Sequence, residues 1–274
     1  MITVRNKLRD KLAKGVPVFG VFSFSGSPRM VEMMGYAGLD YIIIDTEHAS
    51  DDVEKAEGLV RAAEVSGTVP IIRVYHNEPS LIMKALDVGA MGVYVPHVNS
   101  RDDAVQAVQA AKYPPHGTRG VCPRIRAAGY SAASWNQFYK ESNEQTMVWV
   151  IIEEERGVKN IEEIASVPGV DVIGIGTADL SQNMKQFGEY RSDEILRMTE
   201  HACKICKQNG IAFKLGGPAF TWTERFSYED WIRDMEKWRE MGALVFGIGA
   251  GESVLYHHFS QLMRNVKSDL HIAS

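Results

Sequence analysis

The sequence of 274 residues has few cysteines, no long apolar run and no excess of positive charge. Its three cysteines, Cys122, Cys203 and Cys206, are an odd number, which does not fit the paired cysteines of a disulfide-stabilised secreted protein. No apolar stretch reaches the roughly 18 residues that indicate a membrane span. Residues 1–15 carry charges throughout and lack the apolar core of a signal peptide. These absences predict a cytoplasmic protein with reduced thiols and no membrane partner.

The charge balance also excludes a class of partner. Lys and Arg number 30 and Asp and Glu number 35, so the net charge is -5. A nucleic-acid-binding surface needs a concentration of basic residues, and we therefore expect no nucleic-acid partner. A small anionic substrate stays open, because one or two local cations can hold it. The composition, 45% hydrophobic and 24% charged, is typical of a globular protein and excludes disordered and collagen-like classes.

Eight short apolar runs alternate with amphipathic stretches along the chain. The runs are rich in Val, Ile and Tyr and nearly continuous, as in strands that are buried on both faces of a parallel sheet. We predict strands at Val18–Phe24, Tyr41–Asp45, Val69–Val74, Gly92–His97, Val148–Glu153, Asp171–Gly176, Ala212–Gly217 and Ala243–Gly249.

A helical pattern follows each run, and glycines such as Gly38, Gly89 and Gly242 stand where helices should end. We predict helices at Pro28–Ala37, Asp51–Ser66, Pro79–Val88, Ser100–Lys112, Gly157–Ala165, Ser192–Asn209, Ser227–Met241 and Glu252–Lys267. Eight strand–helix units with short connections predict the α/β class and a closed (β/α)₈ TIM barrel. An open, doubly wound sheet is the second possibility, but it normally uses fewer strands.

The barrel is predicted to occupy residues 1–274 as a single domain, because no composition break marks a second one. A further helix over Val4–Lys14 is expected to cap the bottom of the barrel. The one long connection, Tyr113–Thr146, contains a predicted short helix around Ser134–Ser142. Long ordered loops in compact domains are often functional.

In a barrel of this kind the active site lies at the carboxyl ends of the strands. The fifth predicted strand ends at Glu153, and Asp179 follows the sixth. Two carboxylates without a soft ligand beside them suit Mg²⁺ or Mn²⁺, with water and substrate oxygens completing the shell. The alternative is that both are ordinary surface acids at strand ends.

Three more strand ends carry ionisable side chains. Asp45 ends the second strand and His48 follows in the next turn, a spacing that suits a carboxylate-oriented acid/base histidine or a purely structural one. Arg73 lies inside the third strand, where a buried charge is costly unless it is paired, so it is either paired structurally or directed at an anionic ligand. His97, at the end of the fourth strand, is expected to pack rather than to line a pocket.

The last two strands are less informative. Gly216–Gly217 and Gly249–Gly251 resemble the phosphate grip of many barrels, although glycine there also permits tight turns. Lys214 is the only lysine in these strands that could form an imine with a substrate, and it does not fall at a strand end. Cys203 and Cys206 lie within a helical pattern, so we expect a structural role for them.

The strand-end motifs together resemble the metal-dependent pyruvate aldolases, of the 4-hydroxy-2-oxoheptanedioate aldolase and 2-keto-3-deoxy-sugar-acid aldolase type. These enzymes belong to the phosphoenolpyruvate/pyruvate barrel superfamily. The resemblance covers roughly residues 15–185 in order. It is carried by Ile44–Ala49, Pro70–Arg73, Ala85–Ala90, Val95–Val98, Tyr113–Gly120, Ile152–Glu153, Val167–Asp171 and Gly174–Ser181.

The resemblance implies roles for five of the residues above. Glu153 and Asp179 would hold a divalent metal ion, Mg²⁺ or Mn²⁺, with Co²⁺ as a further candidate. His48 would be the acid/base, oriented by Asp45. Arg73 would face the pyruvyl oxygen and the enolate that develops from it, where a fixed positive charge stabilises the forming anion.

The resemblance also implies contacts outside this set. Backbone N–H groups of Gly176, Thr177 and Ala178 would bind the pyruvate carboxylate, and Asp87 would reach the site of a neighbouring subunit. The protein would be a homo-oligomer, a hexamer or trimer of dimers, with swapped C-terminal helices. Glu252–Lys267 would then pack on a neighbour.

The activity implied is reversible aldol cleavage of 4-hydroxy-2-oxo acids to pyruvate and an aldehyde, through a metal-bound pyruvate enolate. Its partners are small molecules, a 2-oxo acid and an aldehyde. The alternatives are another pyruvate-enolate C–C lyase, such as a CoA-thioester lyase or a decarboxylase, and a non-catalytic barrel that binds a 2-oxo acid. The sequence departs from the family pattern at Thr177, usually Pro, at Ile151, usually Gln, and over 217–225, which we expect to shape the aldehyde pocket.

Overall fold

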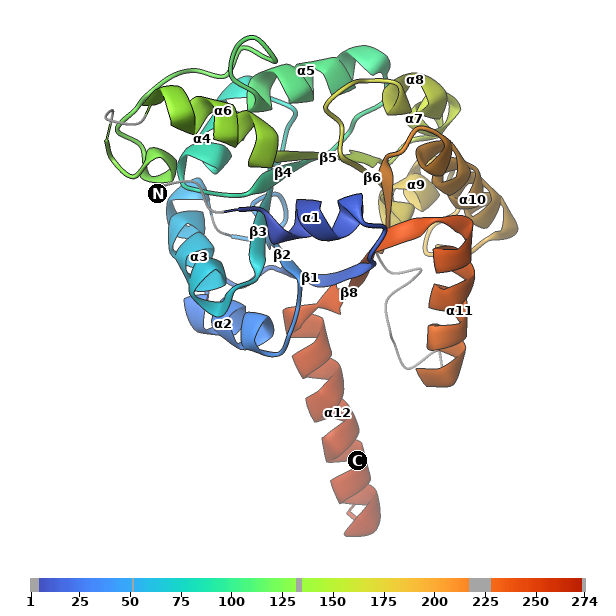
Figure 1. Cartoon of the computed structure of the whole chain (residues 1–274). Helices are drawn as coiled ribbons and strands as arrows, with labels where there is room; N and C mark the ends of the chain where they lie inside the picture. The colour runs from blue at the N-terminus through green and yellow to red at the C-terminus, as the bar shows by residue number, and fades with distance from the viewer. Residues whose placement is uncertain (1–4, 51, 132–134, 217–227, 273–274) are drawn as a thin grey trace.

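The structure is a computed structural model of the whole chain, and it describes residues 5–50, 52–131, 135–216 and 228–272. Eight parallel strands pair in chain order, and the first strand pairs with the last to close a barrel. Helices surround this barrel on the outside (Figure 1). The predicted α/β class and (β/α)₈ barrel are confirmed.

The strand boundaries agree with the sequence predictions to within two residues. The strands are β1 (Val18–Ser23), β2 (Tyr41–Asp45), β3 (Val69–Arg73), β4 (Gly92–Val95), β5 (Met147–Ile152), β6 (Val172–Ile175), β7 (Ala212–Leu215) and β8 (Ala243–Ala250). Because β4, β5, β6 and β7 end earlier than predicted, His97, Glu153, Gly176 and Gly216 lie just beyond strand ends, on the rim of the barrel mouth.

The helices follow the strands as predicted, with three differences, one of which is the additional 3₁₀ helix η1. They are α1 (Lys7–Ala13), α2 (Pro28–Tyr36), α3 (Val53–Ser66), α4 (Pro79–Asp87), α5 (Arg101–Ala111), the 3₁₀ helix η1 (Arg126–Ala128), α6 (Trp135–Gln145), α7 (Glu155–Lys159), α8 (Ile161–Ala165), α9 (Thr177–Asn183), α10 (Asp193–Gln208), α11 (Tyr228–Met241) and α12 (Gly251–Asp269). The helix expected over Gly157–Ala165 is two helices that meet at Asn160, whose side-chain amide donates to the carbonyl of Asn99 (2.8 Å). Thr177, Ala178 and Asp179, which the sequence analysis placed after the sixth strand, form the first turn of helix α9, which was not predicted.

Some predicted boundaries cannot be compared. Four residues at which helices were expected to begin lie outside the described residues: Val4, Asp51, Ser134 and Ser227. The segment 217–225, which was expected to shape the aldehyde pocket, also lies outside them.

The amino-terminal half of the barrel interior is filled by large side chains. The rings of Tyr41 and Tyr94 meet the Trp149 indole edge-on, with centroids 5.2 and 5.8 Å away. The same apolar cluster includes Leu8 of α1, which is 1% exposed. Helix α1 crosses this end of the barrel, so the predicted capping helix is confirmed (Figure 1). Among the described residues, the amino-terminal end of the barrel is therefore packed with side chains and covered by α1.

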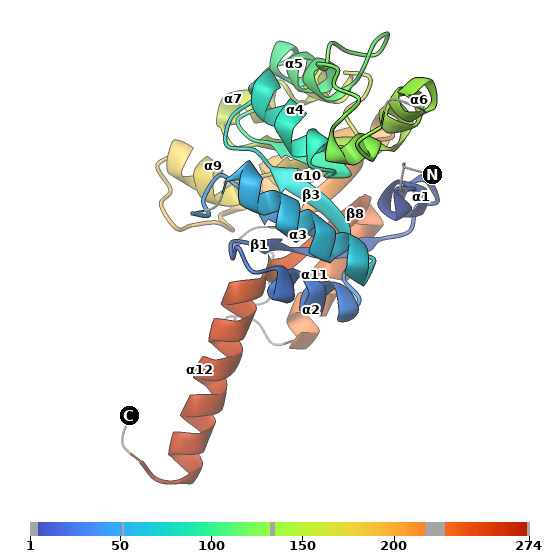
Figure 2. The same ribbon diagram turned by 90° about the vertical axis from the view of Figure 1, so that its left-hand side faces the viewer.

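Helix α12 extends away from the barrel in both views (Figures 1 and 2). Its start is fixed by Glu252, whose carboxylate accepts hydrogen bonds from the backbone N–H groups of Phe24 (3.3 Å) and Ser25 (2.8 Å). Large apolar side chains along it are at least 39% exposed: Val254, Leu255, Tyr256, Phe259, Leu262, Met263 and Val266. No helix in the described part of the chain has both the length and the apolar character that crossing a membrane requires.

The cysteine pair of α10 is buried in the layer between strands and helices. Burial raises the pKa of the Cys203 thiol to about 11 and raises the pKa of Cys206 further. Both are therefore protonated at neutral pH, which agrees with the structural role expected for them. Cys122 is exposed.

Candidate active site

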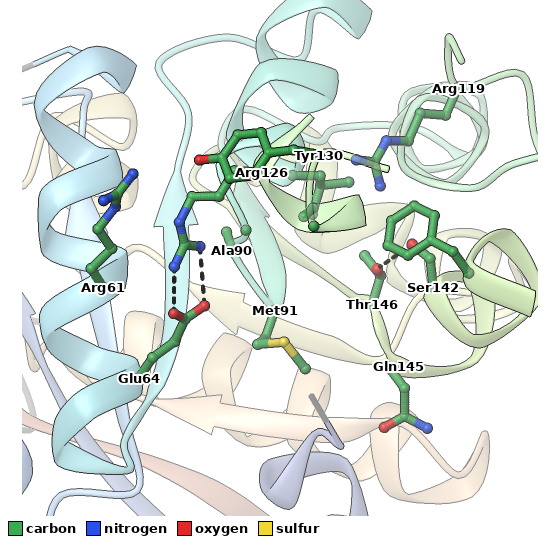
Figure 3. Close-up of a pocket in the computed structure, with 15 residues that line it drawn as sticks. Arg61, Glu64, Ala90, Met91, Arg119, Arg126, Tyr130, Ser142, Gln145 and Thr146 are labelled. Atoms are coloured by element: carbon green, nitrogen blue, oxygen red, sulfur yellow. Dashed lines mark hydrogen bonds and ion pairs between the residues drawn. The ribbon is translucent and has the colours of Figure 1, made fainter. Parts of the chain in front are cut away.

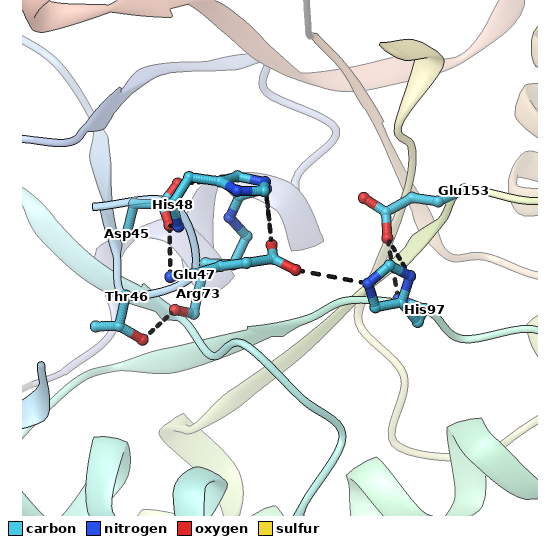
Figure 4. A network of polar contacts seen from close by, with 7 residues as sticks. All are labelled: Asp45, Thr46, Glu47, His48, Arg73, His97 and Glu153. Atoms are coloured by element: carbon cyan, nitrogen blue, oxygen red, sulfur yellow. Dashed lines mark hydrogen bonds and ion pairs between the residues drawn. The ribbon is translucent and has the colours of Figure 1, made fainter. Parts of the chain in front are cut away.

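The carboxyl ends of β2, β3 and β5 and the residues after β4 bring ionisable side chains together on one side of the barrel mouth (Figure 4). The network is formed by Asp45, Thr46, Glu47, His48, Arg73, His97 and Glu153. Residues 45–48 are consecutive at the end of β2, and the barrel places them beside Arg73, His97 and Glu153, which come from three other strand ends.

Arg73 is paired with two carboxylates. It ends β3 directly opposite Asp45 in the strand register, and its Nη2 donates to Asp45 Oδ2. Its Nη1 lies 3.1 Å from Glu47 Oε2. Asp45 is 1% and Arg73 is 7% exposed, so each charge needs the other to offset its lost hydration. The guanidinium is thus held in a fixed position, with its carbon 4.8 Å from the centre of the Phe22 ring.

Asp45 also shapes the turn that follows β2. Its second oxygen, Oδ1, accepts hydrogen bonds from the backbone N–H groups of Glu47 (2.8 Å) and His48 (3.0 Å). The expected contact between Asp45 and the imidazole of His48 is wrong, because the carboxylate already holds Arg73 and this turn. The His48 ring instead lies 3.8 Å from Glu47 and is 60% exposed. Asp45 therefore positions His48 through the backbone and leaves the ring open to the barrel mouth.

His97 joins the two acidic residues of the site. Its Nδ1 lies 3.2 Å from Glu153 Oε2, and its Nε2 lies 3.6 Å from Glu47 Oε1. Its backbone N–H donates to the same Glu153 oxygen (3.1 Å). A φ of +56° is uncommon for a residue other than glycine, and it turns both groups of His97 towards one carboxylate. The expectation that His97 packs is therefore wrong; its place after Pro96 at a strand end was the available signal.

Glu153 has an unusual proton affinity. It is 4% exposed, and burial raises its pKa to about 7, against the opposing influence of His97. Burial also raises the pKa of Glu47, although Arg73 opposes the shift. A buried carboxylate that ionises reluctantly is stabilised by a cation placed beside it.

The donor set fits a hard divalent cation. Asp179 lies in the first turn of α9, directly after the strand that neighbours β5, and its negative charge helps to raise the pKa of Glu153. Within the described ranges, no three His, Cys, Asp or Glu side chains form a complete metal-binding group. Two protein oxygens with water and substrate completing the shell is the arrangement that Mg²⁺ commonly uses.

The residues after β6 lie against Glu153. A Cβ atom at Gly176 would come within 2.6 Å of Glu153 Cγ, so the close approach requires glycine. Thr177 is completely buried, and its hydroxyl has no hydrogen-bond partner among the described residues. The hydroxyl is therefore shielded from the mouth in this structure. Ile151 is 3% exposed and belongs to the apolar interior of the barrel, below Glu153.

Asp87 lies apart from the other predicted residues. Helix α4 runs back from the carboxyl ends of the strands, so its last residue, Asp87, lies near their amino ends. Its carboxylate accepts a hydrogen bond from Arg119 Nη2 (2.7 Å), and the Arg119 guanidinium stacks 4.6 Å from the Tyr113 ring. Within one chain, Asp87 is not part of the site at the barrel mouth.

Arg119 lines a cavity of about 480 Å³ (Figure 3). Met91 and Thr146, which also line it, directly precede β4 and β5, so this cavity lies at the amino ends of the strands. Its three arginines each have an acidic partner: Arg61 pairs with Glu57, Arg126 with Glu64 and Arg119 with Asp87. The cavity thus has no uncompensated charge, and it lies at the end of the barrel opposite the usual site of catalysis.

One cation of the barrel interior has a different environment. Lys214 of β7 is 4% exposed, and its Nζ lies 5.1 Å from the Phe22 ring and 5.4 Å from the Tyr94 ring. Burial, reinforced by the charge of Arg73, lowers its pKa to about 7. The sequence alone drew attention to this residue only as a weak candidate for an imine.

The protein is a closed parallel barrel whose mouth holds acidic residues, a fixed arginine and an exposed imidazole. These features define an α/β-barrel enzyme, and the comparisons with known proteins show that it is a carbon–carbon lyase. The chain belongs to the HpcH/HpaI aldolase/citrate lyase family, whose model matches residues 18–217. The resemblance inferred from the strand-end motifs is confirmed.

Individual relatives cover most of the chain. A 2-dehydro-3,6-dideoxy-6-sulfogluconate aldolase of Pseudomonas putida is 35% identical over 72% of this chain and 77% of its own length. A 5-keto-4-deoxy-D-glucarate aldolase of Enterobacter sp. (strain 638) is 34% identical over 75% of this chain and 79% of its own. The crystal structure of citrate synthase SbnG superposes with a TM-score of 0.84 and 31% identity, covering 96% of this chain and 98% of that one.

Proposed function

We propose that this protein is a divalent-metal-dependent aldolase that cleaves 4-hydroxy-2-oxo acids reversibly to pyruvate and an aldehyde. The observation that carries the proposal is the network at the barrel mouth, where Arg73, Glu47, His97 and Glu153 are held in one arrangement. Two relatives that are named as aldolases of keto-sugar acids support the choice of reaction.

Glu153 and Asp179 would hold the metal ion. Both donate only oxygen, which suits Mg²⁺ or Mn²⁺, with Co²⁺ as a further candidate. When bound, the ion would act as a Lewis acid on the ketone of the 2-oxo acid. The raised pKa of Glu153 fits this role, because a neighbouring cation would favour its ionised form.

The remaining chemistry is proton transfer and charge stabilisation. His48 would accept the proton of the C4 hydroxyl as the C3–C4 bond breaks and the C4 carbonyl forms. The electron pair of the broken bond would move into the enolate of pyruvate, which a proton at C3 then converts to the methyl group. Arg73, fixed by Asp45 and Glu47, would face the enolate oxygen, where a preoriented charge needs no rearrangement during the reaction.

Backbone N–H groups of Gly176, Thr177 and Ala178 would bind the pyruvate carboxylate. Thr177 and Ala178 begin α9, and the first N–H groups of a helix have no partner within it. The N–H of Gly176 donates to the carbonyl of Ile152 (2.9 Å) in the free protein, and would exchange that hydrogen bond for the carboxylate. Glycine at 176 lets the backbone approach Glu153 closely, which would bring the carboxylate and the metal ligands together.

We further propose a homo-oligomer, a hexamer or trimer of dimers, in which α12 packs on a neighbouring subunit. The exposed apolar side chains of this helix support the proposal. Asp87 would reach a site only in an oligomer, because it lies far from the mouth of its own barrel. Phe259→Glu and Leu262→Glu should lower the mass measured by light scattering after gel filtration. Unchanged mass in both variants would contradict a role for α12 in assembly.

The activity is tested by pyruvate release from a panel of 4-hydroxy-2-oxo acids, followed with lactate dehydrogenase. Chelation should abolish release, and Mg²⁺ or Mn²⁺ should restore it. His48→Ala should lose cleavage while still binding Mn²⁺, whereas His201→Ala, on α10 and paired with Glu162, should behave as the wild type. Release that persists after complete metal removal would overturn the metal dependence.

A second candidate is another pyruvate-enolate C–C lyase, such as a decarboxylase or an enzyme of CoA thioesters. The structural similarity to a citrate synthase supports this second candidate. Pyruvate formation from oxaloacetate, without cleavage of any 4-hydroxy-2-oxo acid, would select this candidate. Tight pyruvate binding with no turnover of either substrate class would select a non-catalytic 2-oxo-acid-binding barrel.

A further inference from the structure

The chain buries two lysines in different environments. Lys112 is 6% exposed, and its Nζ donates to the carbonyls of Asn143 (2.7 Å) and Thr146 (2.6 Å). Lys214 is 4% exposed, but among the described residues it has neither a hydrogen-bond acceptor nor a carboxylate partner. Burying an unpaired amine is costly. Lys112 is thus a satisfied structural group, whereas Lys214 has no such partner among the described residues.

The amine of Lys214 points towards the barrel mouth. Gly216 is two residues further along the chain, on the same face of the barrel wall and nearer the carboxyl end. A Cβ atom at Gly216 would come within 2.7 Å of Lys214 Nζ, and one at Gly247 within 3.2 Å. The side chain therefore rises towards the mouth through space that two glycines leave free. The sequence suggested that Gly216 forms part of a phosphate grip. This geometry instead indicates that Gly216 leaves room for the Lys214 side chain.

The amine also lies beside the candidate active site. The Phe22 ring lies between the two interior cations, with its centre 4.8 Å from the Arg73 guanidinium carbon and 5.1 Å from Lys214 Nζ. The neighbouring strands add little charge. Lys214 faces Arg73 from β3, Tyr94 from β4 and Phe22 from β1, and it pairs in register with Gly174 of β6 and Val245 of β8. No acidic group on these strands compensates it.

We propose that Lys214 is a second cation of the substrate site, which binds the carboxylate of a 2-oxo acid from inside the barrel. The proposal rests on the proposed function for the identity of the ligand. Arg73 already has two carboxylates from its own chain, whereas Lys214 has none among the described residues, so an arriving anion would supply the partner that Lys214 lacks. A carboxylate has about four acceptor positions, and it can accept hydrogen bonds from Lys214 and from backbone N–H groups at once.

Binding should be coupled to proton uptake. Above pH 7 the amine of the free protein is mostly neutral, because burial and Arg73 lower its pKa to about 7. A carboxylate beside it favours the charged form, so the amine takes a proton from solvent as the ligand binds. The other charged group facing it is Arg73, and burial raises the pKa of Tyr94, which therefore stays protonated near neutral pH.

The test uses oxalate, a planar dicarboxylate that cannot be cleaved, and the full-length protein loaded with Mg²⁺. Calorimetric titration at pH 8 in two buffers of different ionisation enthalpy measures the protons taken up per oxalate bound. The wild type should take up a proton. Lys214→Met should abolish the uptake and weaken oxalate binding about 10- to 100-fold, as expected for the loss of one charged hydrogen bond.

Lys112→Met is the matched control, since it removes the other buried lysine by the same chemical change. It should keep the wild-type affinity and proton uptake. Oxalate affinity and uptake that are unchanged in Lys214→Met would overturn the proposal.

A second measurement needs no variant at position 214. In wild-type protein with ¹³Cε-labelled lysine, oxalate at pH 8 should move one buried ε-carbon signal to the position of a charged amine. The spectrum of Lys112→Met separates that signal from Lys112. No shift on saturation with oxalate overturns the proposal, and so does an absence of oxalate binding by the wild type. Failure of the aldolase proposal is distinguishable, because oxalate binding and proton uptake would then persist without cleavage of any 4-hydroxy-2-oxo acid.

Discussion

The two sides of the barrel mouth hold their cations in opposite ways. On the side of β2, β3 and β5, Arg73 is matched by two carboxylates, Asp45 and Glu47, at hydrogen-bonding distance. On the side of β6 to β8 the inward positions near Lys214 are glycines, and the described groups that face its amine are the Phe22 and Tyr94 rings and the like charge of Arg73. The charge of Arg73 is thus matched by carboxylates of the chain, whereas no carboxylate among the described residues matches Lys214.

This difference separates two uses of a buried charge. A paired guanidinium keeps its charge and its position whether or not a ligand is present, which suits stabilisation of a transient enolate. An unpaired amine with a pKa near 7 gains its charge when an anion arrives, which suits ligand binding. The comparison therefore predicts that substitutions of the two cations change the free energy of unfolding in opposite directions.

The largest effect should come from Glu153→Gln, on the paired side. The variant keeps the shape of the side chain but loses a metal ligand, and we expect cleavage to fall about 10³-fold or more, since Lewis acidity contributes several kcal/mol. Pyruvate release and Mn²⁺ binding measure the loss. Glu154→Gln, one residue further along, is the control and should retain both. Full activity in Glu153→Gln would remove Glu153 from the metal site.

Arg73→Met should destabilise the protein strongly. It leaves Asp45 and Glu47 buried without their cation, and the loss of one partner from a buried pair costs about 3 to 5 kcal/mol. Urea unfolding measures the change in the free energy of unfolding. Arg233→Met, which breaks an exposed pair with Asp230, should cost less than about 1 kcal/mol. A similarly small cost for Arg73→Met would mean that the two carboxylates do not depend on it.

Lys214→Met should have the opposite sign and stabilise the protein. The pKa of Lys214 is about 7 in the folded protein and 10.5 ordinarily, so between these values only the unfolded chain binds the proton. Wild-type stability should therefore rise with pH through this window, and the full cost of the buried charge is present below pH 7. The gain in Lys214→Met should be about 1 to 4 kcal/mol near pH 6 and smaller near pH 10. Thermal unfolding across this range measures it, and a gain that does not change with pH would contradict the assignment.

The smallest change in the free energy of unfolding is expected at Thr177, which follows β6 on the same side of the barrel mouth as Lys214. Its buried hydroxyl has no partner among the described residues, so Thr177→Val should stabilise the protein by up to about 1 kcal/mol. Thr199→Val is the contrasting change, because the Thr199 hydroxyl donates to the carbonyl of Ile195 (2.7 Å). That variant should lose about 1 kcal/mol. Chemical denaturation measures the free energy of unfolding of both variants. An equal decrease in the two would show that the Thr177 hydroxyl has a hydrogen-bond partner.

The sequence was sufficient to predict the barrel, because each buried parallel strand is a short apolar run between glycine-terminated helices. It also pointed to the strand ends, where Asp45, Arg73 and Glu153 lie as expected. Their contacts could not be predicted, since these depend on the register between strands. The pairing of Asp45 with Arg73 rather than with the His48 ring follows from their direct opposition in β2 and β3.

His97 and Lys214 were hard to interpret for a related reason. His97 became significant through its positive φ, and no local pattern predicts which histidine adopts it. Lys214 stands within an apolar strand, and its environment is set by Phe22, Tyr94 and Gly247, from three other strands. Local sequence does not encode such distant contacts.

The glycines beside Lys214 have a consequence for redesign of the pocket. Enlarging Gly216 would force the end of the Lys214 side chain to move, because the new methyl group would come within 2.7 Å of its amine. Once the side chain at 214 is shortened, the same enlargement fills a void. The two positions are therefore energetically coupled, and changes there will not be additive. A search for new aldehyde specificity that varies positions one at a time would reject combinations at 214 and 216 that the fold accepts together.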